Sequence, residues 1–439
     1  MNKSKEFNFL ENLIENKNAY IGIIGLGYVG LPLAMTFAES KFNVLGIDID
    51  KKKVNSLNAS KSYINHIPDK KIEKLVKSKK LHAVSNFEKV KELDVIIICL
   101  PTPLDKHREP DLSYVINTMK NIEPYFRKGQ ILSLESTTYP GTTKEELLPF
   151  IKNAGFKIGE DYFLIYSPER EDPGNKQFNT TNIPKILGGI TNACNSIGTL
   201  LYSKVVKEVI TVDDTATAEM TKLLENIHRA INIGLMNELK PLAEKMGVDL
   251  YEVIRAASTK PFGFVPYYPG PGLGGHCIPI DPFYLTWKAK EYGMHTRFIE
   301  LAGEINSSMP QYVVDKIASA LNDRGKPIKN SAVLILGVSY KKNIDDMRES
   351  PSLEIINLLK KKKANVNYSD PFFRSLTKTR KFDIELNGVE ITSQSLRKYD
   401  VVVIATDHDS FDYELIKNNS KLIIDTRGRF NISENIIRA

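Results

Sequence analysis

The feature that most limits the possible folds is a glycine-rich turn between a predicted strand and a predicted helix. Residues 20–24 are apolar and predict a buried strand, Gly25-Leu26-Gly27-Tyr28-Val29-Gly30 follows at once, and residues 31–40 predict a helix. The apolar segment 44–48 predicts the next strand. Strand, glycine turn, helix and strand in this order form the βαβ unit of a doubly wound parallel sheet.

The same turn matches the fingerprint of a dinucleotide site. Gly25 allows the tight turn, Gly27 lets a pyrophosphate approach the backbone, and Gly30 permits close packing of the helix on the strand. Tyr28 and Val29 lie at the start of the helix, whose free N–H groups favour an anion. The turn therefore predicts that the pyrophosphate of a dinucleotide binds here.

Further cofactor residues follow neighbouring predicted strands. Asp48 suits the hydroxyls of an adenosine ribose, which favours NAD over NADP, although Lys53 close by weakens that exclusion. Thr102 and Thr137 come just beyond predicted strands, on the side where such sheets bind ligands. We therefore predict NAD as the cofactor.

A second α/β unit begins near residue 332. The apolar segments 332–340 and 401–406 parallel the first strands, but the later glycines of the fingerprint are missing, so we expect a different nucleotide there. Between the two units, apolar residues recur at helical spacing from 213 to 245 and predict one long helix that Gly247 ends. We expect an α/β protein with two Rossmann-like doubly wound domains joined by this long central helix. We predict three domains. Residues 1–211 form the NAD-binding domain, residues 212–308 form a central domain with a dimerisation helix and the cysteine loop, and residues 309–439 form the second Rossmann-like domain.

The loop that most suggests chemistry ends in Cys277 and has Asp281 four residues further on. The glycines before the thiol remove the Cβ atoms that would keep the backbone away from a ligand. A reactive thiol needs positive charge or hydrogen-bond donors nearby. Lys222, Asn226 and Arg229 follow one another at spacings of four and three, which places them on one face of the long helix. The pattern indicates oxidation through a covalent thioester.

Composition excludes other classes of protein. The formal charge is +7 over 439 residues and the lysines are scattered, which favours an anionic small molecule over nucleic acid. The cysteines at positions 99, 194 and 277 have no paired spacing, which argues for a reducing compartment and against a disulfide or a metal site. We expect Cys99 in an apolar strand and Cys194 in a loop, both inert. No apolar run reaches the roughly 18 residues that cross a bilayer, and the amino end does not resemble a signal peptide, so we expect a cytoplasmic protein without membrane contact.

These residues together resemble the UDP-glucose/GDP-mannose dehydrogenase family. The resemblance covers nearly the whole chain, through residues 25–30, Ser167-Pro168-Glu169-Arg170, 219–226, the Cys277 loop, Tyr340-Lys341-Lys342 and Arg348-Glu349-Ser350-Pro351. Within the family, the sequences of residues 259–264 and of Gly275-His276-Cys277 are most similar to the UDP-N-acetylhexosamine branch. The chain departs from UDP-glucose enzymes at Pro173, where they have a second glutamate, which favours an N-acetyl sugar and leaves open whether Glu169 alone serves as the base.

The resemblance implies a role for each matching residue. It implies that UDP-N-acetyl-D-glucosamine is oxidised at C6 from alcohol to carboxylate with two NAD, through a thiohemiacetal and a thioester on Cys277, and that 309–439 binds the UDP-sugar. The implied catalytic residues are Cys277, Lys222, Asn226, Asp281 and Glu169, and Arg348 is implied to reach NAD, which requires a site between the two α/β units. The implied substrate residues are Arg170, Glu171, Lys222, Asn226, Arg229, Tyr268, Gly274, Lys341 and Arg427.

Several alternatives stay open. UDP-N-acetyl-D-mannosamine differs from the favoured substrate at one stereocentre, which residue spacing does not resolve, and UDP-glucose is the third candidate. A two-electron 3-hydroxyacid dehydrogenase would use a similar amino-terminal domain and a helix with Lys and Asn four apart, but no thiol. A catalytically silent nucleotide-sugar sensor is the candidate from another class. We expect a homodimer or higher homo-oligomer, and a product used for capsule, lipopolysaccharide or another glycoconjugate.

Overall fold

The computed structural model describes residues 3–64, 67–105, 107–171, 180–275, 278–379 and 381–439. The chain divides into two compact units, the first made of residues 1–225 and 283–294 and the second of residues 226–282 and 295–439. Each unit is built around its own sheet, mostly parallel in unit 1 and parallel in unit 2. The predicted fold class, two Rossmann-like α/β domains joined by a long helix, is confirmed.

The elements of unit 1 alternate between strands and helices, as a doubly wound sheet requires. Its strands are β1 (Tyr20–Ile24), β2 (Asn43–Ile47), β3 (Leu81–Val84), β4 (Val95–Ile98), β5 (Gln130–Leu134), β6 (Tyr162–Tyr166), β7 (Lys185–Gly189) and β8 (Val209–Thr211). Its helices are α1 (Lys5–Glu15), α2 (Gly30–Glu39), α3 (Lys51–Asn58), α4 (Asp69–Lys77), α5 (Ser113–Ile122), α6 (Leu148–Asn153) and α7 (Asn192–Ser203), with short turns η1 (Glu88–Glu92), η2 (Glu123–Tyr125) and η3 (Thr143–Leu147).

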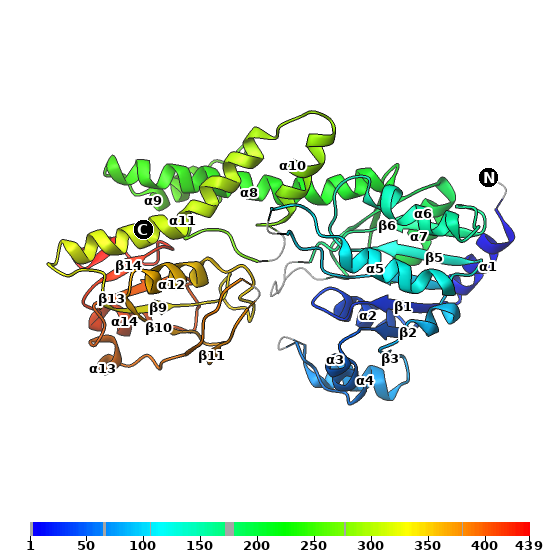
Figure 1. The fold of residues 1–439 in the computed structure, drawn as a ribbon, viewed down its shortest axis with the longest axis horizontal. Coiled ribbons are helices and arrows are strands. Elements are labelled where there is room, and N and C mark those ends of the chain that lie inside the picture. The colour runs from blue at the N-terminus through cyan, green and yellow to red at the C-terminus, as the bar shows by residue number, and fades with distance from the viewer. Residues whose placement is uncertain (1–2, 65–66, 106, 172–179, 276–277, 380) are drawn as a thin grey trace. The chain divides into compact units, whose positions relative to one another are not determined.

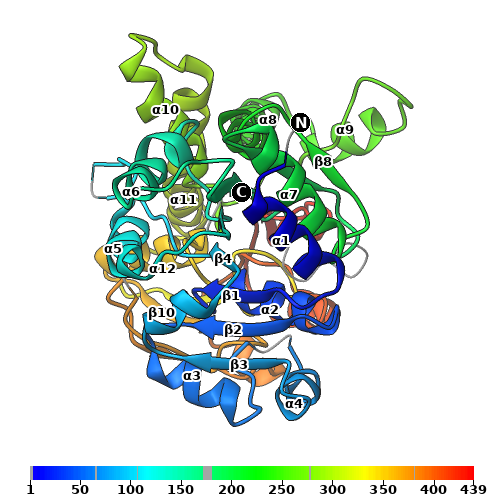
Figure 2. The ribbon, with the colours of Figure 1, turned by 90° about the vertical axis from the view of Figure 1, so that its right-hand side faces the viewer.

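The strands of unit 1 join in the order β3-β2-β1-β4-β5-β6-β7-β8 among the described residues. Neighbouring strands are parallel except for β6 and β7. Figure 2 shows β4, β1, β2 and β3 following one another in this order. The order reverses between β1 and β4, and the carboxyl ends of such strands are where doubly wound sheets bind ligands.

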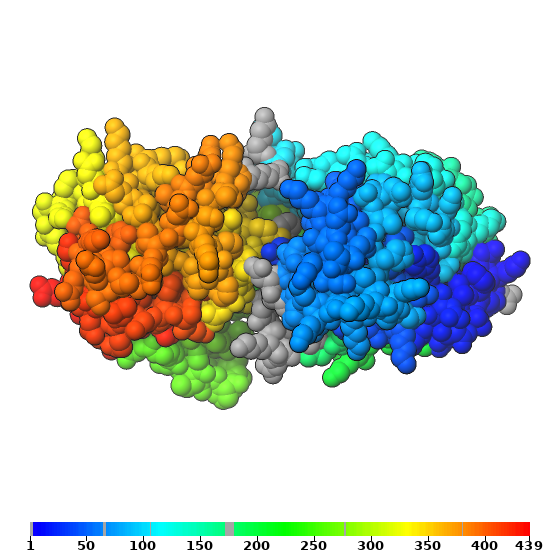
Figure 3. Space-filling view, turned by 90° about the horizontal axis from the view of Figure 1, so that it is seen from below, coloured from blue at the N-terminus to red at the C-terminus, as the bar shows by residue number. Residues whose placement is uncertain are grey.

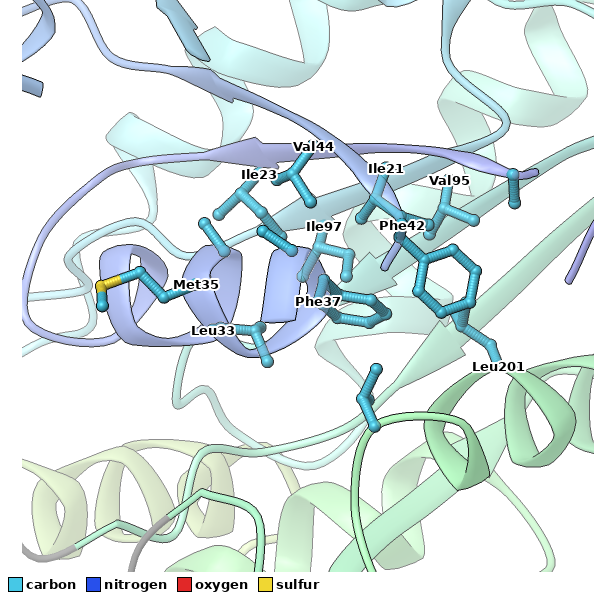
Figure 4. Packing of buried hydrophobic residues seen from close by; sticks show 14 of the residues in the cluster. Ile21, Ile23, Leu33, Met35, Phe37, Phe42, Val44, Val95, Ile97 and Leu201 are labelled. Carbon is cyan, nitrogen blue, oxygen red and sulfur yellow. The ribbon is translucent and has the colours of Figure 1, made fainter. Parts of the chain in front are cut away.

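Apolar side chains cover both faces of this sheet. On one face, Phe37 of α2 meets Phe42 edge to face, with ring centroids 5.8 Å apart, and Leu201 of α7 joins them (Figure 4). The strands contribute Ile21, Ile23, Val44, Val95 and Ile97 to that face, and α5 and α6 cover the other. The isoleucine-rich strands are buried on both faces, as parallel strands between helical layers are.

The chain passes from one unit to the other within two helices, at residues 225–226 and 282–283. α8 (Thr215–Lys245) is continuous over 31 residues with Pro241 inside it (Figure 1), and α10 spans Asp281–Glu291. Asp214 caps the start of α8, because its Oδ1 accepts a hydrogen bond of 2.7 Å from Thr217 N. The long helix predicted from 213 to 245 is therefore confirmed.

Unit 2 holds the second sheet, with β10-β9-β13-β14-β15 all parallel among the described residues. Its strands are β9 (Ala332–Leu336), β10 (Asn365–Ser369), β11 (Ser375–Leu376), β12 (Leu386–Asn387), β13 (Val401–Ile404), β14 (Ile423–Asp425) and β15 (Ile436–Arg438). Its helices are α9 (Leu250–Ala257), α11 (Arg297–Asn322), α12 (Pro351–Lys361), α13 (Ser393–Leu396) and α14 (Tyr413–Asn419). In Figure 3 the carboxyl-terminal residues of unit 2, coloured orange to red, gather in one part of the surface, whereas the strands β13 and β14 themselves are buried.

Candidate active site

The glycine turn of unit 1 has the geometry that a pyrophosphate needs. Gly25 has φ +93°, and a Cβ there would lie 2.4 Å from Cys99 O. A Cβ on Gly30 would lie 1.8 Å from Gly25 O, so both positions require glycine. A Cβ on Gly27 would meet nothing within 4 Å. The open space at Gly27 leaves its backbone accessible, and this fits NAD.

The start of α2 adds favourable electrostatics beside this turn. Val29 is the residue before the helix, and no side chain caps its first turn. Tyr28 precedes it and packs against the apolar core. An uncapped helix start offers backbone N–H groups and partial positive charge to an anion.

Asp48 lies directly beyond β2 with both carboxylate oxygens engaged. Its Oδ2 accepts a hydrogen bond of 2.8 Å from Leu26 N and one of 3.2 Å from Lys53 Nζ, and its Oδ1 accepts from Asp50 N at 2.9 Å. The carboxylate therefore ties the glycine turn to the loop after β2. Each oxygen keeps acceptor capacity for a ribose hydroxyl. Lys53 thus forms an ion pair with Asp48, and the predicted contact of both side chains with the ribose stays a prediction.

Thr102 and Thr137 lie together beyond β4 and β5. Thr102 Oγ1 donates to Thr137 O at 2.7 Å, and Thr102 O accepts from Tyr284 OH of α10. The Thr102 hydroxyl thus joins two loops at the carboxyl edge of the sheet. The predicted contact of either threonine with NAD stays a prediction.

The segment after β6 carries Glu169, Arg170 and Glu171. Glu169 Oε1 accepts hydrogen bonds of 2.7 Å from the N–H groups of both following residues. The Arg170 guanidinium donates to both oxygens of Glu225 on α8, at 2.6 and 3.3 Å, and Glu171 Oε2 accepts from Thr180 Oγ1 at 2.7 Å. Arg170 therefore anchors this segment to α8, and its predicted role at the sugar stays a prediction.

Beside this segment lies a buried pair that the sequence analysis missed. Lys185 Nζ lies 2.7 Å from Glu135 Oε2, and Tyr202 OH donates to the other Glu135 oxygen. Burial opposes the charge of Lys185, but the carboxylates of Glu135 and Glu169 outweigh it and raise the Lys185 pKa. Lys185, without Glu135, lines a small pocket together with Glu169 and Arg170. A carboxylate that directly follows an apolar strand was the signal that could have revealed it.

Lys222 is buried on α8, one turn after a second missed carboxylate, Glu219. Glu219 accepts from Gly141 N at 2.6 Å and from the Thr143 N and Oγ1 at 2.9 and 2.7 Å. These bonds fix α8 to the turn before η3 within unit 1. Lys222 therefore projects from a rigidly held stretch of helix.

Asn226 and Asp281 lie together in unit 2. Asn226 Nδ2 donates to Asp281 Oδ2 at 2.6 Å, and the two residues are 4% and 2% exposed. The contact joins α8 to the first residue of α10. Cys277, four residues before Asp281, lies outside the described residues. The sequence prediction that Asn226 and Asp281 share a site is consistent with this contact.

The loop that leads to Cys277 packs on the loop after β9. A Cβ on Gly274 would lie 2.5 Å from Tyr340 Cβ, and Gly275, with φ +89°, donates from its N–H to Arg348 O at 3.0 Å. Lys341 directly follows Tyr340. The Arg348 guanidinium contacts both oxygens of Asp346, at 2.7 to 3.0 Å. Unit 2 thus brings Gly274, Lys341 and Arg348 into one region; the contact of Arg348 with NAD stays a prediction.

Arg427 and Tyr268 lie near the ends of β13 and β14. Arg427 Nε donates to Ala405 O at 2.7 Å, and Tyr268 stacks on Tyr251 with ring centroids 6.3 Å apart. Tyr251 OH donates to Thr426 O at 2.9 Å. Arg229, by contrast, is exposed on α8, whereas Lys222 and Asn226 are buried. The substrate roles of Arg427, Tyr268 and Arg229 stay predictions.

Other kinds of site are not found in the described part of the chain. No group of three or more His, Cys, Asp or Glu side chains there could hold a metal ion. No helix described is long and apolar enough to cross a membrane. Cys99 is partly buried after β4, and Cys194 lies buried inside α7. The prediction that Cys194 lies in a loop is wrong, because Thr191 caps a helix there: Thr191 Oγ1 accepts from Cys194 N at 3.2 Å.

Comparison with known proteins gives matches along most of the chain. Residues 19–206, 216–308 and 334–432 match, in turn, the NAD binding domain, the central domain and the UDP binding domain of the UDP-glucose/GDP-mannose dehydrogenase family. The chain is 35% identical over 424 residues to Protein CapL of Staphylococcus aureus, covering 95% of this chain and 97% of the relative. It is 34% identical over 393 residues to the UDP-N-acetyl-D-glucosamine 6-dehydrogenase of Salmonella typhi, covering 89% and 90%.

A solved structure agrees in fold. The UDP-D-ManNAc dehydrogenase of Pyrococcus horikoshii superposes with a TM-score of 0.85 at 32% identity, covering 95% of this chain and 98% of that one. The resemblance read from the residues is therefore confirmed, and the amino-terminal sheet belongs to an NAD-binding domain. With its fold, its glycine turn and its three matching domains, the chain belongs to the UDP-glucose/GDP-mannose dehydrogenase family.

Proposed function

We propose that the chain catalyses the NAD-dependent four-electron oxidation of the C6 hydroxyl of UDP-N-acetyl-D-glucosamine to the uronate. The observation that carries the proposal is the buried hydrogen bond of 2.6 Å between Asn226 and Asp281. Asp281 lies four residues after Cys277 in the chain. The Salmonella typhi relative, a UDP-N-acetyl-D-glucosamine 6-dehydrogenase, supports the choice of substrate. The fit of the glycine turn to a pyrophosphate supports NAD.

The residues of the chain divide the work as follows. Asn226 keeps one amide hydrogen for the substrate, because its Nδ2 carries two and Asp281 accepts one. Together with Lys222 it stabilises the oxyanion, a kind of donor that is worth about 3 kcal/mol in a dry site. The Cys277 thiolate adds to the aldehyde formed first, and water later cleaves the thioester. Glu169 and Asp281 move protons and orient that water.

NAD, when bound, accepts a hydride in each of the two oxidation steps. The residues that would hold it are Gly25, Gly27, Gly30, Asp48 and Lys53. Gly27 would face the pyrophosphate and Asp48 the adenosine ribose. Lys341 and Arg427 of unit 2 would bind the UDP moiety, because their charges suit phosphates.

The second candidate is the mannosamine epimer. The structural match to the Pyrococcus horikoshii UDP-D-ManNAc dehydrogenase, with a TM-score of 0.85, favours it. An NADH assay with UDP-GlcNAc, UDP-ManNAc, UDP-GalNAc and UDP-glucose separates the candidates. We expect the highest kcat/KM with UDP-GlcNAc. A higher value with UDP-ManNAc would move the assignment to the epimer, and no NADH with any of the four sugars would favour a silent sensor.

We also propose that the enzyme is cytoplasmic and that its uronate product is used for a surface polysaccharide.

We further propose that the chain forms a homodimer through α8. Leu224, Leu235 and Leu242 are 59%, 46% and 53% exposed. Their spacings of eleven and seven residues place them on one face of the helix. A second copy of the chain would cover this apolar face. Light scattering should give a molar mass of twice the chain mass of 49.5 kDa. For Leu235→Asp, the measured mass should fall to that of one chain.

A further inference from the structure

A buried lysine of unit 2 has no hydrogen-bond partner among the residues that the structure describes. Lys240 on α8 is 4% exposed, and no described residue accepts a hydrogen bond from its Nζ. Burying an ammonium group without a partner is costly, and most buried charges are paired. Lys240 is therefore an exception, and we expect its Nζ to have a hydrogen-bond acceptor other than the described residues.

Arg427, whose charge acts on Lys240, forms no ion pair with a carboxylate of the described residues, although the charges of Asp407 and Asp425 act on it. Arg427 uses its Nε for Ala405 O at 2.7 Å and its backbone N–H for Asp425 Oδ1 at 2.9 Å. No described carboxylate forms an ion pair with its guanidinium. A Cβ on Gly270 would lie 2.9 Å from Arg427 Nη1, so the loop passes close to the guanidinium at a residue without a side chain. In the described part of the chain, no residue accepts a hydrogen bond from the outer nitrogens of Arg427, so these nitrogens are the donors that a ligand could use.

Hydrogen bonds connect the stretch of α8 that carries Lys240 to the loop that passes close to Arg427. Asn237, one turn before Lys240 on α8, accepts from Gly270 N at 2.9 Å and donates to Asn306 Oδ1 at 2.8 Å. Tyr251 of α9 donates to Thr426 O at 2.9 Å. These bonds tie α8 to α11 and to the loop that holds Gly270, and they tie α9 to the residue before Arg427.

The acids around Lys240 are engaged elsewhere. Asp425 Oδ2 accepts from Phe430 N at 2.9 Å and from Arg438 Nη1 at 3.2 Å. Glu244 Oε2 accepts from Tyr312 OH at 2.6 Å, and its Oε1 pairs with Lys316 of α11. Asp249 Oδ2 lies 3.4 Å from Arg438 Nη2.

Around Lys240, the nearby acids do not offset the effects of burial and of the neighbouring cations. Burial, followed by the charge of Arg427, lowers the Lys240 pKa to about 7; Arg438 lowers it further, and Asp425 and Glu244 raise it only in part. A buried site with an excess of positive charge attracts an anion, and a bound anion restores the charge of the lysine.

We propose that Lys240 and Arg427 form an anion site that binds a phosphate of the nucleotide-sugar diphosphate, which makes Lys240 a further substrate-binding residue. This rests on the proposed function. Arg427 lies beyond the carboxyl ends of β13 and β14, the edge at which such sheets bind nucleotides. The uracil and the N-acetylhexosamine carry no charge, so the diphosphate is the part of the substrate that matches two cations.

The test compares UDP with uridine by calorimetry, in the wild type and in Lys240→Met. Methionine keeps the length of the side chain and removes the charge. We expect UDP to bind about tenfold more weakly to the variant, a loss of one charged contact, and uridine to bind equally to both. Lys245→Met, at an exposed lysine of the same helix, is the matched control and should bind UDP as the wild type does.

The stability of the free protein shows that the variant is folded. Because the folded pKa of Lys240, about 7, lies below its usual 10.5, the unfolded chain binds more protons between these values. The contribution of Lys240 to stability therefore rises with pH across that window. Lys240→Met should have a higher melting temperature than the wild type at pH 7. Its stability should not show the increase with pH that Lys240 gives the wild type.

The outcomes separate this proposal from the proposed function. Equal UDP affinity of wild type and Lys240→Met would overturn the anion site, whichever sugar the enzyme oxidises. An equal loss of uridine affinity would overturn it too, since it would place the effect outside the phosphates. Weaker UDP binding with unchanged uridine binding supports the site even if the NADH assay identifies another UDP-sugar. Orthophosphate that binds as tightly as UDP would show an adventitious ion only.

Discussion

Asn226 Nδ2 donates a hydrogen bond of 2.6 Å to Asp281 Oδ2, and this contact joins α8 to the residue that starts α10. Both side chains are buried, so the bond is little weakened by water. The second hydrogen of Nδ2 meets no acceptor among the described residues. The account of the candidate site depends on this hydrogen.

Removing the orienting carboxylate should slow catalysis more than it weakens binding. Asp281→Ala leaves Asn226 without its acceptor, and we expect kcat to fall by about 10²- to 10³-fold, as for the loss of an oxyanion donor. Steady-state kinetics of Asp281→Ala, Asn226→Ala and the double variant measure the coupling. Additive effects would contradict a shared role, because residues that act as a unit are not additive.

The glycine turn offers a test in which fold and cofactor binding respond separately. Gly27→Ala adds a methyl group where nothing lies within 4 Å, so the melting temperature should change little while the KM for NAD rises at least about tenfold. Gly25→Ala should instead lower the melting temperature, because the residue has φ +93° and its Cβ would lie 2.4 Å from Cys99 O. An unchanged KM for NAD in Gly27→Ala would contradict the placement of the pyrophosphate.

Asp48 should determine affinity for NAD through its charge. Asp48→Asn keeps the shape of the side chain, and we expect a KM for NAD raised about tenfold, with NADP used better because Lys53 then lacks its counter-charge. Asp50→Asn is the matched control, since Asp50 caps α3 by accepting from Lys52 N at 2.9 Å and asparagine caps equally well. A control variant that loses as much affinity for NAD would show that the effect comes from the loop.

Neighbouring lysines test the predicted UDP site. Lys341→Ala should raise the KM for the UDP-sugar about tenfold with little change in kcat, as the loss of a phosphate contact does. Lys342→Ala should leave KM unchanged, because Lys342 is exposed and pairs with Asp409 at 3.3 Å. Equal effects of the two substitutions would indicate a general influence of charge.

Much of the fold could be predicted from the sequence because its signals are local. The strands around 20–24, 95–98 and 131–134 are short apolar runs, and each lies in the sheet as predicted. α8 could be predicted from its apolar spacing and from Gly247, and Pro241 lies within it. The helix that holds Cys194 was missed because the capping role of Thr191 was not recognised, although Cys194, Ile197 and Leu201 of α7 are buried at helical spacing.

The parts of the site that escaped prediction depend on contacts between distant residues. Glu219 binds Gly141 and Thr143, more than seventy residues away in the chain, and Glu135 binds Lys185. Arg170 has the charge expected of a substrate residue, yet its partner is Glu225. Residue type and spacing do not show which charge a side chain will meet after folding.

The central claim is that Cys277 carries the oxidised sugar between two hydride transfers. The measurement that tests it most directly is the amount of NADH formed per UDP-sugar consumed, in the wild type and in Cys277→Ala. The account predicts two NADH per sugar and a uronate product for the wild type, and no uronate for the variant. One NADH per sugar in the wild type, or steady uronate production by Cys277→Ala, would contradict it.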